Sequence, residues 1–487
     1  MRKIRKVFIL LWFPVIFCCF FIEQVFSMND THSWTFAQKA MGQNYSSGQL
    51  MTYTVPEEYP LEGTQKFNVS VNGYYTGIYN DNNLWGGNVN FGYFDFEAGN
   101  SVNIVVSYSG SIDSFEILPK GFNIQAEKVS DNALSFQISN VEQYITVIIN
   151  GNYKGDVLHL FANSIDKNIP NVAQKEGYYF DKKQGIHYFG PGYYKLSEMF
   201  SNGTLSVNKK KVIYLAGGAV LDGQLGFNQS SSAEIRGRGM IMNKEEKGMD
   251  NRVVLFVSAS TGGTIEGIII HGHRAPGWVC TNDKSSGLSY RNVKIISTRY
   301  ASTDGIDINQ CTDFTFENMF IRSCDDAVAI KGLDAETSAP VDCRPNKNLL
   351  FEKMQLWNDC NNAFGMGAET RASLYENISL RNSDILFSYD DPNYHETLDE
   401  RSAMNICALH GTYFRNIVFE NIRVNRCERL IGLGFKDNFW FGSIQGDQSY
   451  PGGIDGVIFR NIICESNSGS KIANDIWLYG WYKEGTP

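Results

Sequence analysis

A short apolar motif recurs through the second half of the sequence and limits the folds that this chain can adopt. It places two apolar residues around a single intervening one and, in most copies, ends two positions later in Asn or Lys. Copies lie at residues 293–295, 314–318, 349–353, 378–382, 417–421 and 457–461, and an earlier copy is centred on Ile265. From the second apolar residue of one copy to that of the next, the steps are 21, 35, 29, 39 and 40 residues.

Short strands at such steps are typical of a solenoid whose coils stack and hide their apolar residues inside. No heptad pattern or amphipathic helical stretch lies between the copies, and the leucine ladders of leucine-rich repeats and the Trp-Asp signatures of propellers are missing. We therefore expect an all-β fold in which residues 176–487 form a right-handed parallel β-helix.

Residues 28–175 have a different pattern. Alternating apolar and polar residues occupy 66–71, 102–108, 133–138 and 144–149, with Asn and Gly turns between them. Several short strands at such spacing predict an antiparallel β-sandwich. We see no acid–base cluster in this region and expect a structural or carbohydrate-facing accessory domain. A chain of 487 residues is about three times the commonest domain size, which agrees with this division.

The first 27 residues have the pattern of a secretory signal. Four Lys and Arg residues within positions 2–6 precede an apolar stretch over residues 7–22, and residues 25–27 resemble a cleavage site. A retained membrane anchor is the alternative, but 16 apolar residues fall short of the about 20 that a spanning helix needs. A lipoprotein is disfavoured because no small residue directly precedes Cys18. We expect a secreted or periplasmic protein, with no membrane contact after signal cleavage.

The net charge of the chain limits the classes of molecule that it can bind. The 43 Lys and Arg residues against 52 Asp and Glu residues give a net charge of −9, the wrong sign for binding nucleic acid or anionic membranes. Neutral or polyhydroxylated partners fit better.

Two of the ten cysteines lie in the leader, and the others, from Cys280 to Cys464, contain no C-x-x-C pair. That disfavours zinc and redox chemistry, so we expect no cofactor and assign these cysteines a structural role, as disulfides or buried thiols.

Three carboxylates fall at related positions on two consecutive coils. Counting nine residues from Ile295 gives Asp304. The same count from Phe316 gives Asp325, and Asp326 follows directly. Because adjacent strands of such a stack lie about 4.8 Å apart, the like charges should raise the pKa of one carboxyl and keep it protonated beside ionised neighbours. Glycoside hydrolysis requires such an acid and base. The alternative is a calcium site or a set of solvated turn aspartates.

The segments around these aspartates carry a specific resemblance. Thr303-Asp304-Gly305-Ile306-Asp307 and Asp325-Asp326-Ala327-Val328-Ala329-Ile330-Lys331 resemble the N-T-D-G-x-D and D-D-x-x-A-I-K signatures of glycoside hydrolase family 28, the polygalacturonases. Residues 188–192, 213–222 and 235–239 resemble the early coils of the same proteins, and the resemblance covers about residues 187–465. A β-sandwich ahead of a β-helix with such aspartates is also similar to glycoside hydrolase family 49, the dextranase group.

The resemblance implies hydrolysis with inversion in a single displacement. Asp325 would be the general acid, while Asp304 and Asp326 would hold and deprotonate the attacking water. Asp307 would support the coil rather than react.

Two departures from the family pattern bear on the substrate. Where polygalacturonases have a G-H-G histidine, this sequence has Asn362. Where they have the Arg-Ile-Lys that binds the uronate carboxylate, it has Asn405-Ile406-Cys407, so both cations are missing. A buried carboxylate without a cationic partner binds poorly. We therefore expect a neutral or differently charged sugar in place of simple polygalacturonan.

The count of nine residues also predicts a polar groove beside the aspartates, because it reaches Arg274, Cys360, Tyr389 and Glu428 on other coils. The side chains that we expect to bind substrate are His273, Arg274, Lys331, Asn362, Glu369, Arg371 and Tyr389. Lys331 has the alternative role of closing its coil. His271 and His273 have the spacing of metal ligands on a strand, but without a third ligand we expect them to serve hydrogen bonding, and we expect no metal.

Together these features predict a secreted, inverting glycoside hydrolase that acts on a polysaccharide or oligosaccharide. A polysaccharide lyase on the same fold is one alternative; it would use Lys331 or Arg274 as a base, with the aspartates as a metal site. A non-catalytic carbohydrate-binding surface protein is another. An unsaturated product would indicate the lyase, and glycan binding without cleavage would indicate the surface protein.

Overall fold

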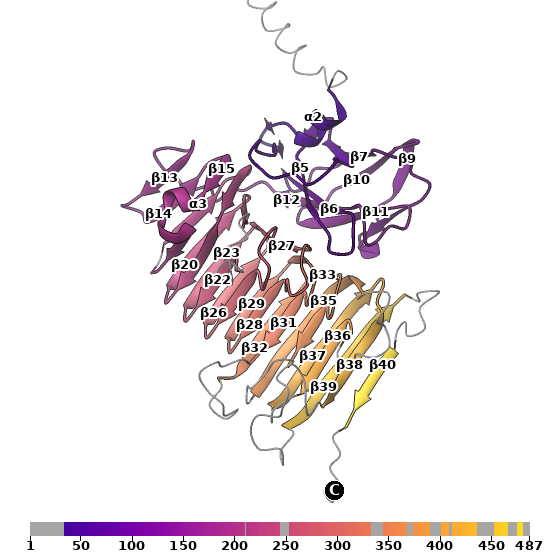
Figure 1. Ribbon diagram of the computed structural model, residues 1–487, viewed down its shortest axis with the longest axis vertical. Coiled ribbons are helices and arrows are strands. Elements are labelled where there is room, and N and C mark those ends of the chain that lie inside the picture. The colour runs from indigo at the N-terminus through magenta and orange to yellow at the C-terminus, as the bar shows by residue number, and fades with distance from the viewer. Residues whose placement is uncertain are drawn as a thin grey trace, which may run out of the picture.

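The chain folds into two β-rich units with very little helix (Figure 1). The computed structural model describes residues 34–209, 211–243, 253–332, 344–367, 374–389, 401–408, 412–435, 452–465 and 475–480. The expected class, a parallel β-helix preceded by a β-sandwich, is confirmed. The helical segments are α2 (Phe36–Met41), η2 (Lys120–Phe122), α3 (Leu196–Met199) and η3 (Ser201–Gly203). Within the described ranges, no helix combines the length and the apolar character needed to cross a membrane.

Two facing sheets form the N-terminal unit. One has the order β1 (Tyr45–Ser46), β2 (Leu50–Thr52), β6 (Asn88–Phe96), β12 (Val157–Ser164), β11 (Gln143–Ile149) and β8 (Phe115–Leu118), with β5 (Ile78–Asn82) also on β6. The other has the order β4 (Tyr74–Thr76), β3 (Phe67–Val71), β7 (Val102–Tyr108), β10 (Ala133–Ile138) and β9 (Ala126–Ser130). Neighbouring strands are antiparallel except β6 and β12, which run parallel. Apolar side chains such as Phe94, Ile104 and Leu134 fill the space between the sheets.

The second unit is a solenoid whose coils each contribute strands to three faces. The first face contains β14 (Ile186–Phe189), β17 (Val212–Leu215), β20 (Ser231–Gly237), β23 (Thr261–Glu266), β26 (Ser286–Arg291), β29 (Thr312–Glu317), β32 (Asn346–Glu352), β35 (Leu374–Ser388), β37 (Thr412–Val424) and β39 (Gly452–Cys464), with β13 (Tyr178–Asp181) antiparallel to β14. The second face contains β15 (Gly192–Lys195), β18 (Ala219–Asp222), β21 (Met240–Met242), β24 (Ile269–His271), β27 (Lys294–Ser297), β30 (Phe320–Ser323) and β33 (Gln355–Asn358), and continues into the last parts of β35, β37 and β39.

The third face is a separate parallel sheet. It contains β16 (Thr204–Val207), β19 (Gln224–Asn228), β22 (Leu255–Ser258), β25 (Cys280–Asp283), β28 (Ile306–Asn309), β31 (Val328–Lys331), β34 (Phe364–Met366), β36 (Met404–Ala408), β38 (Arg429–Phe435) and β40 (Asp475–Tyr479). Because successive side chains of a strand point to opposite sides, each strand turns alternate residues into the coil and leaves the others outside. The apolar residues turned inward form one continuous core along the stack.

The repeated apolar motif belongs to the first face, with one exception. Phe316 pairs with Phe351, Phe351 with Leu380, and so on to Phe419 and Phe459, as the spacing predicts. Their side chains stack inside the coil; the ring centroids of Phe316 and Phe351 are 4.4 Å apart. Ile295 is the exception, and its predicted place in the series is wrong. It lies in β27 of the second face and pairs with Ile321.

The true member of the series on that coil is Tyr290 of β26. It pairs with Ile265 on one side and with Phe316 on the other. The two segments are hard to tell apart in the sequence because each alternates apolar residues and only a tight turn at Asn292 separates them.

Asparagines form the corner between the first two faces. Asn292, Asn318, Asn382, Asn421 and Asn461 have φ values of 54°, 51°, 49°, 57° and 52°, a left-handed conformation that asparagine tolerates better than most residues. Their amides bond from coil to coil: Nδ2 of Asn318 donates to Oδ1 of Asn292 (2.8 Å), and Nδ2 of Asn421 to Oδ1 of Asn382 (2.8 Å). The final Asn of the motif therefore both turns the chain and links the coils.

The N-terminal sheet packs against the outside of the second face, and Figure 1 shows the indigo and purple strands along that flank. The outward residues of this face are apolar, and they include Met240, Ile269, Phe320 and Trp357. They meet N-terminal aromatic residues such as Phe161 in one buried cluster. Burying one large apolar side chain contributes about 1.5–3 kcal/mol, so this interface joins the two units into a single folded body.

Candidate active site

Asp304 and Asp326 occupy the same position on neighbouring coils. Ile306 at the start of β28 pairs with Val328 at the start of β31, and each aspartate lies two residues before its strand. The backbone N–H of Gly305 donates to the carbonyl oxygen of Asp326 (2.8 Å), which holds the two turns together. The predicted equivalence of Asp304 with Asp325 is therefore wrong by one residue, because its count began at Ile295 on another face.

Two more side chains continue this position along the stack. Asn362 lies two residues before β34, and Ser402 lies two residues before β36. The backbone N–H and the side-chain Nδ2 of Asn362 both donate to Oδ1 of Asp326, each at 2.9 Å. The Oδ1 atom of Asn362 accepts the backbone N–H of Ser402 (2.9 Å). Hydrogen bonds thus fix the side chain of Asp326 and align it with the coils that follow.

A buried lysine accompanies Asp304. The Nζ atom of Lys331 lies 2.8 Å from Oδ2 of Asp304 and 3.0 Å from Oδ1 of Asp307, and 3.7 Å from the ring centroid of Trp278. Asp304 is only 3% exposed. Burial, together with the charge of Asp307, raises the pKa of Asp304 well above its ordinary range, and Lys331 opposes that shift. A cation of the protein itself therefore already occupies the space between two of the carboxylates.

Asp326 and Asp325 differ in exposure. Asp326 is 6% exposed, and burial and the charge of Asp325 raise its pKa well above the ordinary range. Asp325 is half-buried, and its Oδ1 accepts Nδ2 of Asn361 and the backbone N–H of Asp326, both at 3.0 Å. Three carboxyl groups thus share one site, in which two are buried and one faces outward.

The residues predicted to bind substrate lie in different places. Lys331 and Asn362 contact the aspartates, as described above. Tyr389 is half-buried, and its ring stacks on Phe387 with centroids 5.0 Å apart. The guanidinium of Arg274 is partly exposed and lies 4.0 Å from Glu62 of the N-terminal unit. Glu369 and Arg371 lie outside the described residues.

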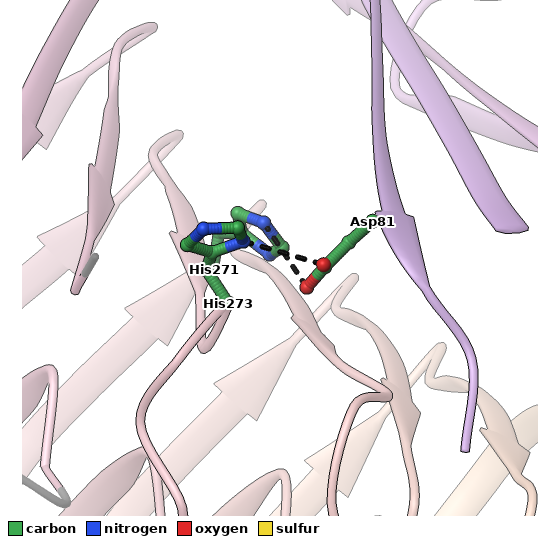
Figure 2. Close-up of side chains that lie close together, drawn as sticks. All are labelled: Asp81, His271 and His273. Atoms are coloured by element: carbon green, nitrogen blue, oxygen red, sulfur yellow. Dashed lines mark ion pairs between the residues drawn. The ribbon is translucent and has the colours of Figure 1, made fainter. Parts of the chain in front are cut away.

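His273 does not line a groove with these residues. Its side chain is 1% exposed and faces Asp81 of the N-terminal unit (Figure 2). A histidine enclosed between the two units cannot contact a glycan, so its predicted role in substrate binding is corrected. The sequence offers no sign of this because Asp81 lies in another domain.

Two polar residues near Asp325 were not predicted to bind substrate. Asn361 and Arg401 occupy the position of Asp325 on the next two coils. Asn361 directly precedes Asn362, and Arg401 directly precedes Ser402. Burial lowers the pKa of Arg401, and the charges of Glu428 and Asp325 oppose that shift. The strand pairs of the third face place both residues at the position of Asp325. Counting a fixed number of residues from the repeated motif does not find them, because the loops between the faces differ in length from coil to coil.

The N-terminal unit also reaches the neighbourhood of this site. The indole N–H of Trp85 donates to the carbonyl oxygen of Asp359 (2.9 Å), and Nδ2 of Asn83 donates to its carboxylate (3.0 Å). Asp359 lies two residues before Asn361, which contacts Asp325. The sandwich therefore supports the turn that positions one of the three carboxylates.

The cysteines of the described residues are unbridged. Cys324 and Cys360, on adjacent coils beside Asp325 and Asn361, have their sulfur atoms 3.3 Å apart. The predicted structural role as buried thiols fits six of the seven that are described, since only Cys464 is partly exposed. Cys343 lies outside the described residues.

A family model described as Glycosyl hydrolases family 28 matches residues 168–346. These residues include Asp304, Asp325 and Asp326. The resemblance to glycoside hydrolase family 28 is confirmed. Comparison with the curated proteins finds no match.

Among solved structures, the chain resembles Dex49A from Penicillium minioluteum, with a TM-score of 0.60 and 11% identity over 90% of this chain and 91% of that one. This likeness extends the shared fold to nearly the full length. Two others give lower scores. The catalytic unit of a thermostable GH87 alpha-1,3-glucanase from Streptomyces thermodiastaticus has 12% identity, 92% and 90% coverage and a TM-score of 0.40. A family 28 exopolygalacturonase from Yersinia enterocolitica has 10% identity, 79% and 96% coverage and a TM-score of 0.34.

Proposed function

We propose that this protein is an exported glycoside hydrolase that cleaves a polysaccharide or oligosaccharide with inversion at the anomeric carbon. The observation that carries the proposal is the convergence of Asp304, Asp325 and Asp326 at the ends of two adjacent coils, each held by a donor of the protein. The match to the family 28 model over the same residues supports the chemical class.

The surroundings of each carboxylate support a division of roles. Asp304 accepts from the ammonium of Lys331, and Asp326 accepts two N–H groups of Asn362. Burial raises the pKa of both carboxyl groups, and these donors oppose that rise by stabilising the ionised form. An ionised carboxylate is the form that takes a proton from water. Asp325 is the most exposed of the three and is the group that a glycosidic oxygen can approach. We therefore assign the acid to Asp325 and the base to Asp304 and Asp326.

The proposed reaction is one displacement. Asp325 gives its proton to the glycosidic oxygen as the bond from that oxygen to the anomeric carbon breaks. A water held by Asp304 and Asp326 attacks the opposite face of the carbon and loses a proton to one of them. The products are two sugars, and the new hydroxyl has the inverted configuration.

The residues around the site disfavour simple polygalacturonan as the substrate. Asn405 is buried, and its Nδ2 donates to Oγ of Ser402 (3.2 Å), so it offers no cation for a uronate. Lys331 contacts Asp304 and Asp307, which engages its charge within the protein. The same contacts disfavour a lyase, because the amine that would have to take up a proton instead donates to two carboxylates. Export is proposed from the leader pattern of residues 1–27.

The test is hydrolysis of a panel of pectic, dextran-type and other neutral glycans by the wild type and by Asp304→Asn, Asp325→Asn and Asp326→Asn. Each variant should lose about 10²- to 10⁴-fold in kcat, the usual contribution of general acid–base catalysis. Asp313→Asn, at an exposed position of β29, is the matched control and should keep full activity. Proton magnetic resonance of the first product should show the inverted anomer. Undiminished hydrolysis by Asp325→Asn, or an unsaturated product that absorbs in the ultraviolet, would refute the proposal.

A further inference from the structure

Three side chains of the kinds that bind metals meet between the two units, outside the candidate active site. Asp81 is on β5 of the N-terminal unit, His271 ends β24 of the solenoid, and His273 follows two residues later (Figure 2). Their side chains are 0%, 0% and 1% exposed. One potential ligand atom from each lies within 4.8 Å of the other two.

Two of the distances within the cluster are close to those between the ligands of a small tetrahedral ion. The Nδ1 atom of His273 lies 3.2 Å from Oδ1 of Asp81, and the Nε2 atom of His271 lies 3.6 Å from Oδ2. A zinc ion bound at about 2.0–2.1 Å by tetrahedral ligands keeps those ligand atoms about 3.4 Å from one another. Each oxygen of the carboxylate thus faces one imidazole nitrogen at a separation close to that value.

The hydrogen-bond pattern leaves the inward atoms unpaired. The Nδ1 atom of His271 lies 3.2 Å from the carbonyl oxygen of Ile296, so Nδ1 carries the hydrogen of the neutral ring and Nε2 carries a lone pair. That lone pair faces the carboxylate of Asp81. In the described part of the chain, Nε2 of His271, both ring nitrogens of His273 and Oδ2 of Asp81 have no hydrogen-bond partner. A backbone carbonyl that fixes the opposite ring nitrogen is a usual companion of a metal-binding histidine.

The carboxylate of Asp81 faces the Nε2 lone pair of His271, with Oδ2 and Nε2 3.6 Å apart. Two electron-rich atoms turned toward each other in a buried site are unfavourable unless a cation lies between them.

Arg299, Glu62 and Arg274 carry the other charges around the cluster. The Nη2 atom of Arg299 contacts Oδ1 of Asp81 and lies 2.6 Å from Oε1 of Glu62, and Nη2 of Arg274 lies 4.0 Å from the same Oε1 atom. Arg299 thus engages one carboxylate oxygen of Asp81, and Oδ2 stays directed at His271. Tyr59 and Phe91 close the cluster with ring centroids 6.3 and 5.3 Å from that of His271.

We propose that Asp81, His271 and His273 bind a Zn²⁺ ion that fastens the N-terminal sandwich to the β-helix. Two imidazoles and one carboxylate are a donor set that zinc accepts readily. The ion cross-links β5 to the coil of β24, two segments that are far apart in the sequence. His273 adopts a left-handed backbone conformation with a φ of 45°, an uncommon geometry for a residue other than glycine, and this turn brings its ring toward Asp81.

The experiment measures zinc in the full-length mature protein after equilibration with Zn²⁺ and gel filtration. We expect about one zinc ion per chain in the wild type, and at least tenfold weaker binding in His271→Gln, His273→Gln and Asp81→Asn, in line with the loss of a ligand. His187→Gln, in β14 and far from the cluster in the fold, is the matched control and should bind as the wild type does. Circular dichroism of each variant checks that it is folded.

A second readout depends on the wild type alone, so it holds if a variant fails to fold. Co²⁺ in place of Zn²⁺ should give visible absorption bands of a four-coordinate site with nitrogen and oxygen ligands. Chelation should lower the midpoint of thermal unfolding, and added Zn²⁺ should restore it, because an ion that binds only the folded state stabilises it. Binding well below one ion per folded wild-type chain, or unchanged binding by folded His271→Gln and His273→Gln, would overturn the proposal. Neither result depends on glycan hydrolysis.

Discussion

Asp304 and Asp326 lie at one register position on adjacent coils, and both are buried. Strands of a stack are about 4.8 Å apart, so this position forces two like charges close together inside the protein. Lys331 and Asn362 each stabilise one of the two, but burial still raises the pKa of both carboxyl groups. The arrangement is costly to folding, and residues that reduce stability in this way are characteristic of functional sites.

The first prediction is that Asp326→Asn stabilises the protein while it abolishes activity. Because burial raises the pKa of Asp326 in the folded state above its value in the unfolded chain, ionisation opposes folding as the pH rises through the folded pKa. The amide removes that charge and keeps an oxygen for the N–H groups of Asn362. We expect a higher midpoint of thermal unfolding at pH 7 and a gain that shrinks toward pH 4.

Calorimetric scans of both proteins from pH 4 to pH 8 measure this difference. Asp131→Asn, at a fully exposed aspartate, is the control and should change the unfolding free energy by no more than about 0.5 kcal/mol at any pH. A variant Asp326→Asn that is less stable than the wild type throughout this range would contradict the argument.

The second prediction concerns Lys331→Met. Removing the ammonium leaves Asp304 and Asp307 without their shared partner, and loss of one member of a buried ionic group costs about 3–5 kcal/mol. Burial already raises the pKa of Asp304, so this carboxyl group escapes part of that cost by taking up a proton, and the loss should be larger at pH 7 than at pH 5. Urea unfolding at both pH values measures it, and kcat should fall as well.

Two further variants test this interpretation. Lys347→Met removes a partly exposed lysine that pairs with Glu376 at 2.7 Å and should cost about 1 kcal/mol or less. The double variant Lys331→Met with Asp304→Asn should be more stable than Lys331→Met alone, since one of the two carboxylates that lose the ammonium is then neutral. Strictly additive effects would show that the two residues are not coupled.

The repeated motif made most of the solenoid predictable. Residues that point into the coil must be apolar, and the strand of each coil must lie in register with the strand of the coil before it. That constraint explains why the copies from Phe314 to Phe459 pair as expected. The prediction fails at Ile295 because β26 and β27 of that coil both alternate apolar and other residues. Only the strand pairing shows that Ile295 belongs to the second face. The error moved the expected partner of Asp304 by one residue.

Other parts of the site lay beyond sequence reasoning for a different reason. The surroundings of His273 include Asp81, which belongs to the N-terminal domain. The spacing of residues along the sequence does not predict which residues of two domains meet at their interface. Asn361 and Arg401 share the position of Asp325 only through strand pairs of the third face, and loops of unequal length separate those strands. Local pattern predicts the coil, while contacts between distant segments depend on how the coils and domains pack.

The third prediction is that Asn362→Ala lowers both stability and kcat. The Nδ2 atom of Asn362 donates to Asp326, and its Oδ1 accepts the buried N–H of Ser402. The truncation leaves that N–H and one carboxylate oxygen short of a partner, which costs about 1–3 kcal/mol. Guanidinium unfolding and steady-state kinetics measure the two effects. Asn228→Ala, at an exposed position at the end of β19, is the control and should change neither stability nor kcat. An unchanged kcat in Asn362→Ala would show that Asn362 does not contribute to the reaction.

The fourth prediction is that Arg322→Ala weakens the attachment of the two units. Arg322 is fully buried; its Nε lies 3.2 Å from Oδ2 of Asp359, its Nη1 3.1 Å from Nε2 of His159, and its guanidinium 4.6 Å from the ring centroid of Trp357. The truncation leaves the carboxylate of Asp359 buried without a cation, which costs about 3–5 kcal/mol.

Differential scanning calorimetry with limited proteolysis measures this change, and cleavage in the variant should begin between the two units. Arg291→Ala, which breaks an exposed pair with Glu266 at 2.7 Å, is the matched control and should cost about 1 kcal/mol or less. The double variant Arg322→Met with Asp359→Leu should recover much of the loss, because a packed apolar pair replaces a buried ionic one without leaving a charge behind. If Arg322→Ala unfolds at the wild-type temperature, the buried pair does not hold the interface, and the apolar cluster around Trp357 carries the attachment by itself.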